Sequence, residues 1–272
     1  MTVPAGWYTD PWVPQGVRYW DGATWTLDVA RKPPPGKPPH PELPLVVAVG
    51  AVVTIGVSLV ASRFLVSWLS DYRWPVFWYM VVAATIGYGP VLLFGVWASR
   101  RWGHHSLRAD SGLFFRRTDF GWGPLVWLAC MGSNIVMAVL VTVLHIPFMS
   151  NLEPVDNVHA NRGYVIALLV VGVVVAPVVE EMVFRGYVLR GFLSRMGPVA
   201  AVALQAVLFG MAHFDPVRGT GNIGLIMVLS GVGAVLGGAE YLFRRIGPTM
   251  LAHAIINGLA LTLALTGWLV QR

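Results

Sequence analysis

Seven long apolar segments constrain the fold of this chain more than any other feature. Each is close to the ~20 residues that a helix needs to cross the hydrocarbon core of a bilayer. In lipid, a segment must satisfy its backbone hydrogen bonds internally, which favours helices. The sequence therefore predicts an all-α integral membrane protein with about seven transmembrane helices. The segments span approximately residues 44–69, 74–98, 121–146, 163–189, 197–214, 222–243 and 247–270.

Charge supports this class and predicts a direction in the membrane. Only 12% of the 272 residues are charged, about half the share of a typical soluble domain. A net charge of +6 could suggest a nucleic-acid partner in a soluble protein, but here the basic residues lie mostly in short loops. With the N-terminus in the cytoplasm, thirteen Lys and Arg residues fall inside and four outside. The positive-inside rule favours that orientation in a multi-pass cell-membrane protein.

The N-terminal part differs from the rest in composition. Residues 1–30 contain four tryptophans, and Asp21-Gly22 lies between short aromatic and β-branched stretches, which is a hairpin pattern. We expect a Trp-rich small β-module here, with its tryptophans forming a core. Residues 31–44 are rich in proline and predict an extended, semi-rigid linker. Residues 45–272 then form the transmembrane domain.

Ionisable and polar residues within the apolar segments are the candidate functional residues. A charged group at membrane depth is costly unless it is paired or solvated, so such residues are functional candidates. The alternative is a polar network that only holds helices together. The residues are Glu180, Glu181 and Arg185 in the fourth segment, His213 in the fifth, and His253 and Asn257 in the seventh.

Helical spacing divides these residues into two groups. Glu181 and Arg185 are spaced i,i+4 with the acid first, which favours an ion pair. Glu180 is rotated by about 100° on the helix and remains available for chemistry. Phe209 lies one turn before His213 and is expected to pack beside the site. Glu240, near the inner end of the sixth segment, is expected to pair with an arginine, such as Arg244 at i+4.

Together the residues resemble three motifs of the CPBP family, the CAAX-protease and bacteriocin-processing proteins, also called the Abi family. The motifs are Glu180-Glu181-x-x-x-Arg185, Phe209-x-x-x-His213 and His253-x-x-x-Asn257. They occur in this order on three apolar segments, and the likeness covers about residues 120–270. It implies a four-helix catalytic core. Residues 1–30 are similar to a short Trp-rich bacterial domain of unknown function.

The resemblance implies an intramembrane endopeptidase that cleaves a membrane-associated protein or peptide substrate. It implies that Glu180 and His213 activate water, and that His253 and Asn257 stabilise the oxyanion. Glu181, Arg185 and Phe209 would support the site. The expected partners are this substrate and the lipid bilayer, with no nucleic acid. Counting residues from the connecting turns predicts a site that opens toward the cytoplasmic face.

The cofactor is a separate question, because members of this family are often called metalloproteases. Glu180, His213 and His253 could form a zinc site with one open position. Without a metal, every polar residue has a role, so we favour catalysis with no cofactor.

Two other functions fit the same residues. Buried Glu and His side chains also form proton relays, so a proton-coupled transporter is one alternative. The other is a catalytically silent immunity or scaffold protein that retains the fold.

Overall fold

The structure is a computed structural model that describes residues 4, 6–13, 16–31, 43–69, 72, 74–150 and 162–270. The chain divides into two compact units, Met1–His40 and Pro41–Arg272. Most of the Pro-rich segment 31–44 lies outside the described residues. The two units are described separately below.

The N-terminal unit contains a three-stranded antiparallel sheet, as the sequence predicts. Its strands are β1 (Gly6–Thr9), β2 (Gly16–Trp20) and β3 (Trp25–Arg31), in the order β1-β2-β3. The β2–β3 turn is held by Asp21, whose carboxylate accepts hydrogen bonds from the backbone N–H groups of Ala23 and Thr24 at 2.7 and 2.6 Å. Gly22 has a φ of 102°, which glycine adopts without steric cost. The predicted hairpin is therefore present.

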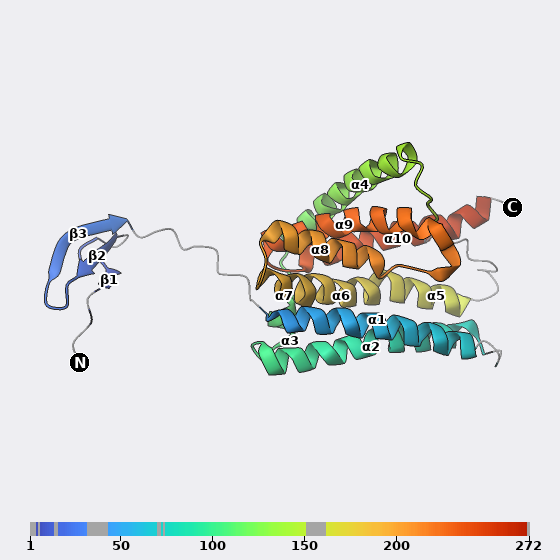
Figure 1. The fold of residues 1–272 in the computed structure, drawn as a ribbon, viewed down its shortest axis with the longest axis horizontal. Helices are drawn as coiled ribbons and strands as arrows, with labels where there is room; N and C mark the ends of the chain where they lie inside the picture. The colour runs from blue at the N-terminus through green and yellow to red at the C-terminus, as the bar shows by residue number, and fades with distance from the viewer. Residues whose placement is uncertain are drawn as a thin grey trace. The chain divides into compact units, whose positions relative to one another are not determined.

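The regular secondary structure in the described residues of the second unit is all helical (Figure 1). Six of its spans are long and apolar enough to cross a membrane: Leu45–Leu69, Phe77–Trp102, Asp119–Val143, Arg162–Leu193, Pro216–Phe243 and Gly247–Leu265. The fold class predicted from the sequence is thus confirmed. The remaining apolar segment, expected at 197–214, gives the 14-residue helix α8 (Pro198–Met211). At 1.5 Å per residue, α8 is about 21 Å long, shorter than a hydrocarbon core of about 30 Å.

The elements of this unit are numbered as in Figure 1. In chain order, the elements other than α8 are α1 (Leu45–Leu69), α2 (Val76–Trp102), α3 (Leu107–Ser111), α4 (Asp119–Val143), α5 (Arg162–Val170), η3 (Val171–Val175), α6 (Ala176–Glu181), η4 (Met182–Leu189), α7 (Arg190–Leu193), η5 (Pro216–Gly221), α9 (Asn222–Phe243) and α10 (Gly247–Val270).

The fourth span, from α5 to α7, is central to the helical unit. It contacts α1 and α2 on one side and α8, α9 and α10 on the other, as Figure 1 shows. Its backbone is not a uniform α-helix, because the π-helical segments η3 and η4 flank α6. Pro177 near the start of α6 lacks an N–H, and its ring would clash with the carbonyl of Val173 in a regular α-helix. Wider π turns relieve that clash and are common at functional sites.

Two buried ion pairs tie the connecting segments to the helices. Arg190 in α7 pairs with Glu240 in α9, with Nη2 and Oε1 2.7 Å apart. Its Nη1 also donates to the backbone oxygen of Asp110 in α3 at 2.9 Å. Glu240 thus pairs with an arginine, as expected, but the partner is Arg190 and not Arg244. Arg244 ends α9 in the left-handed conformation with a φ of 57°, so the helical i,i+4 spacing does not extend to it. The second pair joins Arg245 to Asp119.

Candidate active site

A cavity of about 530 Å³ lies among α4, α6, α8, α9 and α10 in the membrane-spanning unit. Five polar or aromatic side chains singled out from the sequence line it together: Glu180, Phe209, His213, His253 and Asn257. The other two, Glu181 and Arg185, are fully buried behind it. The fold therefore brings the three sequence motifs to one place.

Glu180, in α6 of the central span, lies close to side chains from the helices on both sides of that span. One of its oxygens, Oε1, accepts a hydrogen bond from the hydroxyl of Tyr88 in α2 at 2.9 Å. The other, Oε2, lies 3.8 Å from Nε2 of His253 in α10. Oε2 is buried and has no hydrogen-bond partner in the described part of the chain. This carboxylate oxygen is thus available to a water molecule or a substrate group.

Glu181 makes the ion pair that its spacing predicts, and it also positions a histidine. Its Oε1 lies 3.0 Å from Nη1 of Arg185 and 3.0 Å from Nδ1 of His253. A carboxylate can only accept, so Nδ1 of His253 carries the proton and Nε2 faces Glu180. The helical spacing of Glu181 predicts only its contact with Arg185. The structure adds the contact that fixes the His253 ring.

Phe209 packs at the centre of the charged groups, as its position before His213 suggests. Its ring centroid lies 5.0 Å from the His213 ring and 5.8 Å from the His253 ring. The Arg185 guanidinium carbon lies 4.4 Å from the Phe209 centroid, within the range of a cation–π interaction. The aromatic ring therefore separates the buried ion pair from the cavity and supports both imidazoles.

The hydrogen bonds of His213 and Asn257 define what each can offer to a substrate. Nδ1 of His213 lies 2.9 Å from the carbonyl oxygen of Phe209, so this nitrogen carries a proton. The lone pair of a neutral His213 ring is then on Nε2. Asn257 donates one N–H to the carbonyl of Gly172 in η3 at 2.8 Å. An amide group has two N–H donors, which leaves one for a ligand.

Three residues near the site were missed by the sequence reasoning. Tyr88 lies in α2, outside the region of the family motifs, and carries no charge that would mark it. Trp127 and Asn134 line the cavity from α4, and their buried Nε1 and Oδ1 atoms have no hydrogen-bond partner among the described residues. Asn134 could have been found, because an amide in the middle of an apolar segment is unusual. Tyr88 and Trp127 carried no comparable signal.

The zinc site considered from the sequence is not assembled here. Within the described residues, no group of three His, Cys, Asp or Glu side chains is placed to hold a metal ion. Glu180 and His253 are near each other, but His213 does not complete a group of three with them.

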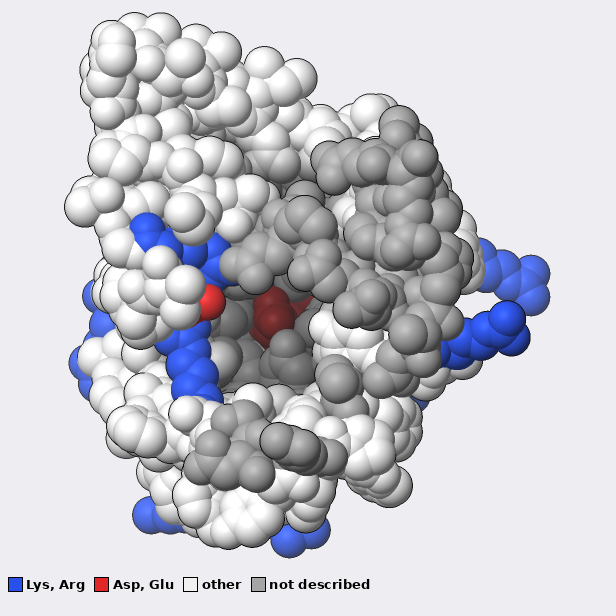
Figure 2. Space-filling view, turned by 90° about the vertical axis from the view of Figure 1, so that its right-hand side faces the viewer, with Lys and Arg blue, Asp and Glu red and all other residues white. Residues whose placement is uncertain are grey.

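The cavity extends toward the end of the helices that carries η5. Ser150 and Phe148 line it there, and Met149 donates its N–H to the carbonyl of Gly221 in η5. Figure 2 shows acidic atoms at the bottom of a hollow when the molecule is viewed from this end. The orientation predicted from the charge distribution would put this end outside. The expected cytoplasmic opening is therefore incompatible with the predicted orientation.

A second cavity of about 780 Å³ adjoins the first between α4 and α9. The two share Asn134, Phe148 and Val228. In Figure 1 the C-terminal end of α4 stands away from α8, α9 and α10. The site is therefore connected to a lateral apolar space beside α4.

Comparison with protein families assigns both ends of the chain. Residues 162–259 match the family model described as type II CAAX prenyl endopeptidase Rce1-like. Residues 5–39 match a family described as a protein of unknown function, DUF2510. Searches of the curated proteins and of the solved structures found no match. The first match contains all seven residues of the three motifs, and the second covers the Trp-rich module.

Proposed function

We propose that this chain, whose residues 162–259 form a Rce1-like type II CAAX prenyl endopeptidase domain of the CPBP family, hydrolyses peptide bonds of a membrane-associated protein or peptide. The family supports intramembrane endopeptidase activity in general. The observation that carries it is the meeting of Glu180, His213, His253 and Asn257 at one cavity.

Glu180 and His213 are the pair that activates water in this proposal. The free Oε2 of Glu180 accepts a proton from water as the oxygen attacks the carbonyl carbon. His213 helps to orient the water and to pass a proton on to the leaving nitrogen through Nε2. When the C–N bond breaks, the products are a carboxylate and an amine, and the water has supplied both the oxygen and the proton.

His253 and Asn257 stabilise the tetrahedral oxyanion. Asn257 has one amide N–H that Gly172 does not use. His253 is held by the Glu181 carboxylate at Nδ1, and a protonated imidazole ring would offer a donor at Nε2. Hydrogen-bond donors that are already fixed in a water-poor site lower the activation free energy by several kcal/mol, because they need no reorganisation during the reaction.

Two buried polar groups of α4, which have no hydrogen-bond partner among the described residues, favour a peptide as the substrate. Trp127 Nε1 is a donor and Asn134 Oδ1 is an acceptor. They lie two helical turns apart, or about 10.5 Å at 1.5 Å per residue. A buried polar atom without a partner is costly, and the backbone N–H and C=O groups of a substrate would satisfy both. This complementarity is a reason to expect the scissile chain alongside α4.

Cleavage of internally quenched peptides by the purified protein in lipid nanodiscs tests the proposal. The panel should hold a farnesylated peptide ending in a CAAX sequence and an unprenylated peptide with an apolar segment. Glu180→Gln should lower cleavage by about 10²–10⁴-fold, the usual contribution of a general base. Equal cleavage by the wild-type and Glu180→Gln proteins would refute the assignment.

The same assay tests the cofactor. We expect cleavage to persist after chelation and dialysis. Loss of activity with recovery on addition of zinc would replace the metal-free reaction with a metal-dependent one.

A further inference from the structure

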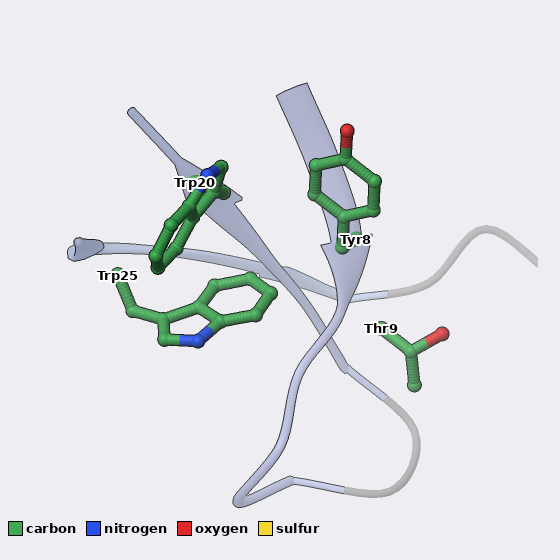
Figure 3. A pocket seen from close by; sticks show the side chains of 4 residues that line it. All are labelled: Tyr8, Thr9, Trp20 and Trp25. Atoms are coloured by element: carbon green, nitrogen blue, oxygen red, sulfur yellow. The ribbon is translucent and has the colours of Figure 1, made fainter. Parts of the chain in front are cut away.

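The N-terminal module carries an aromatic groove that the membrane-embedded site does not use. A cavity of about 450 Å³ on the module is lined by Tyr8, Thr9, Trp20 and Trp25 (Figure 3). The rings of Trp20 and Trp25 meet edge to face at 5.3 Å, and those of Tyr8 and Trp25 at 6.2 Å. Trp12 adjoins them at 6.4 Å from Trp25.

These aromatic side chains line a surface rather than fill a core. Trp12 is 65% exposed, Thr9 is exposed, and Trp20 and Trp25 are half-buried. The expectation that the module's tryptophans form its core is therefore wrong for Trp12, whereas Trp20 and Trp25 pack against each other and remain half-buried. Strand pairing accounts for the placement, since directly paired residues share one face of a sheet and Trp20 pairs with Trp25. Exposed clusters of this kind mark binding sites.

The chemistry of this groove fits a proline-rich segment. A polyproline II helix is pre-formed without internal hydrogen bonds, so it loses little entropy on binding. Small β-domains take such segments in grooves lined with aromatic rings. The chain itself carries a candidate, because residues 33–41 contain six prolines.

Charge is complementary between the groove's module and that segment. Residues 1–31, to the end of β3, contain three aspartates and two arginines. Residues 32–41 contain two lysines and no acidic residue. The two parts therefore carry charges of opposite sign, which favour association when the surfaces are close together.

The geometry of β3 argues against docking of the segment into its own module. Arg31, where β3 ends, pairs with Gly16, at the opposite end of the β2–β3 ladder from the Trp20–Trp25 pair. The segment begins two residues after Arg31, so its start is tethered at the end of the sheet that lies away from the Trp20 and Trp25 rings.

We propose that the groove formed by Tyr8, Thr9, Trp20 and Trp25 binds the proline-rich segment 33–41 of a second copy of this chain. Reciprocal exchange of the two segments closes a symmetric pair, because each copy offers one groove and one segment. Confinement to one membrane raises the effective concentration of the second copy. The module is thus a device for self-association.

Binding of a labelled peptide to the full-length protein tests the groove. The probe is a fluorescein-labelled peptide of residues 31–44, followed by fluorescence anisotropy with the protein in detergent micelles. We expect saturable binding, and at least tenfold weaker binding by Thr9→Lys, which adds a positive charge in the groove without removing an aromatic ring. Trp25→Ala should weaken binding similarly. Leu27→Ala is the control, because Leu27 is 94% exposed and lies outside the groove.

A second peptide tests whether the groove requires proline, and a second measurement tests whether a second copy of the chain occupies it. Replacing the prolines with alanines should abolish binding, and equal binding of the two peptides would overturn the proposal. Photobleaching steps of labelled protein in dilute liposomes should show pairs for the wild-type chain and single copies for Thr9→Lys. Peptide binding without groove-dependent pairing would also overturn it, and would assign the groove to the proline-rich segment of another protein.

Discussion

At the scale of single residues, the contact between Tyr88 and Glu180 is the one that local sequence could not reveal. Glu181 and Arg185 pair within one helix, so their spacing alone predicts the contact. Tyr88 reaches Glu180 across 92 positions of the chain. Only the packing of α2 against the central span brings the two together, and that packing has no local pattern.

The hydroxyl of Tyr88 holds the carboxylate that we assign as the base. We expect Tyr88→Phe to lower cleavage by roughly 10–100-fold. This loss corresponds to one hydrogen bond to a charged group, which contributes about 1.5–3 kcal/mol. The change should affect kcat more than KM, because it acts on the base. Tyr79→Phe is a matched control on the same helix, since the hydroxyl of Tyr79 bonds to the backbone of Leu69 and Trp74. Equal losses in the two variants would contradict a specific role for Tyr88.

A second prediction at this scale concerns Asp10 in the β-module. Burial raises the pKa of Asp10, but the backbone N–H groups of Trp12 and Val13 and the Arg18 guanidinium together bring the pKa below its ordinary value of 3.8. A carboxyl whose pKa is depressed by folding stabilises the module above its unfolded-state pKa. That stabilisation is lost as the pH falls through the lower, folded-state pKa.

Acidification should therefore unfold the module. We expect the dispersed indole NMR signals of the module to collapse below about pH 3.8. Asp10→Asn should be less stable than the wild type at pH 7 and should change less with acid. An identical pH profile for the two proteins would exclude Asp10 as the titrating group.

At the scale of elements, the sequence predicts where the helices lie but not how their backbones deviate. The length and apolar composition of the segments locate six spans and the shorter α8, because a segment must be apolar to lie in lipid. The π turns of η3 and η4 do not follow from composition. Pro177 shows that the helix is interrupted, but the wider turns that result depend on packing against α1 and α10. The partner of Glu240 was mistaken for the same reason, since Arg190 comes from another element.

The Arg190–Glu240 pair joins α7 to α9 and should be a major source of stability for their arrangement. Arg190→Met leaves Glu240 as an uncompensated buried charge, so we expect the free energy of unfolding to fall by about 3–5 kcal/mol. Arg190→Met combined with Glu240→Leu should recover part of the loss. Thermal unfolding in detergent measures both, with the exposed Arg195→Met as control. A double variant less stable than Arg190→Met would contradict this view.

At the scale of the whole molecule, the charge pattern and the position of the cavity together predict the side of the membrane on which the site opens. Thirteen inner against four outer basic residues predict a cytoplasmic N-terminus. In that orientation the cavity, which extends toward η5, would reach the outer side. The motifs correctly predicted which residues would meet. The side on which the site opens depends on helix tilt and on the α4 packing, which sequence distances do not encode.

Cysteine labelling tests this orientation. Cys130 is the only cysteine and is buried, so Cys130→Ser provides a background without a thiol. We expect Thr220→Cys to react with a membrane-impermeant maleimide in intact cells, and Arg195→Cys to react only after permeabilisation. The reverse result would place the cavity's open end in the cytoplasm.

The most direct test of the central claim is the cleavage of native membrane proteins. Membranes from cells that produce the wild-type chain or Glu180→Gln at equal levels can be compared by mass spectrometry of new protein N-termini. The account predicts a set of cleavage sites that are present with the wild-type chain and absent with Glu180→Gln. If the two sets of N-termini are the same, while both proteins are folded and inserted, this chain does not cleave peptide bonds through Glu180.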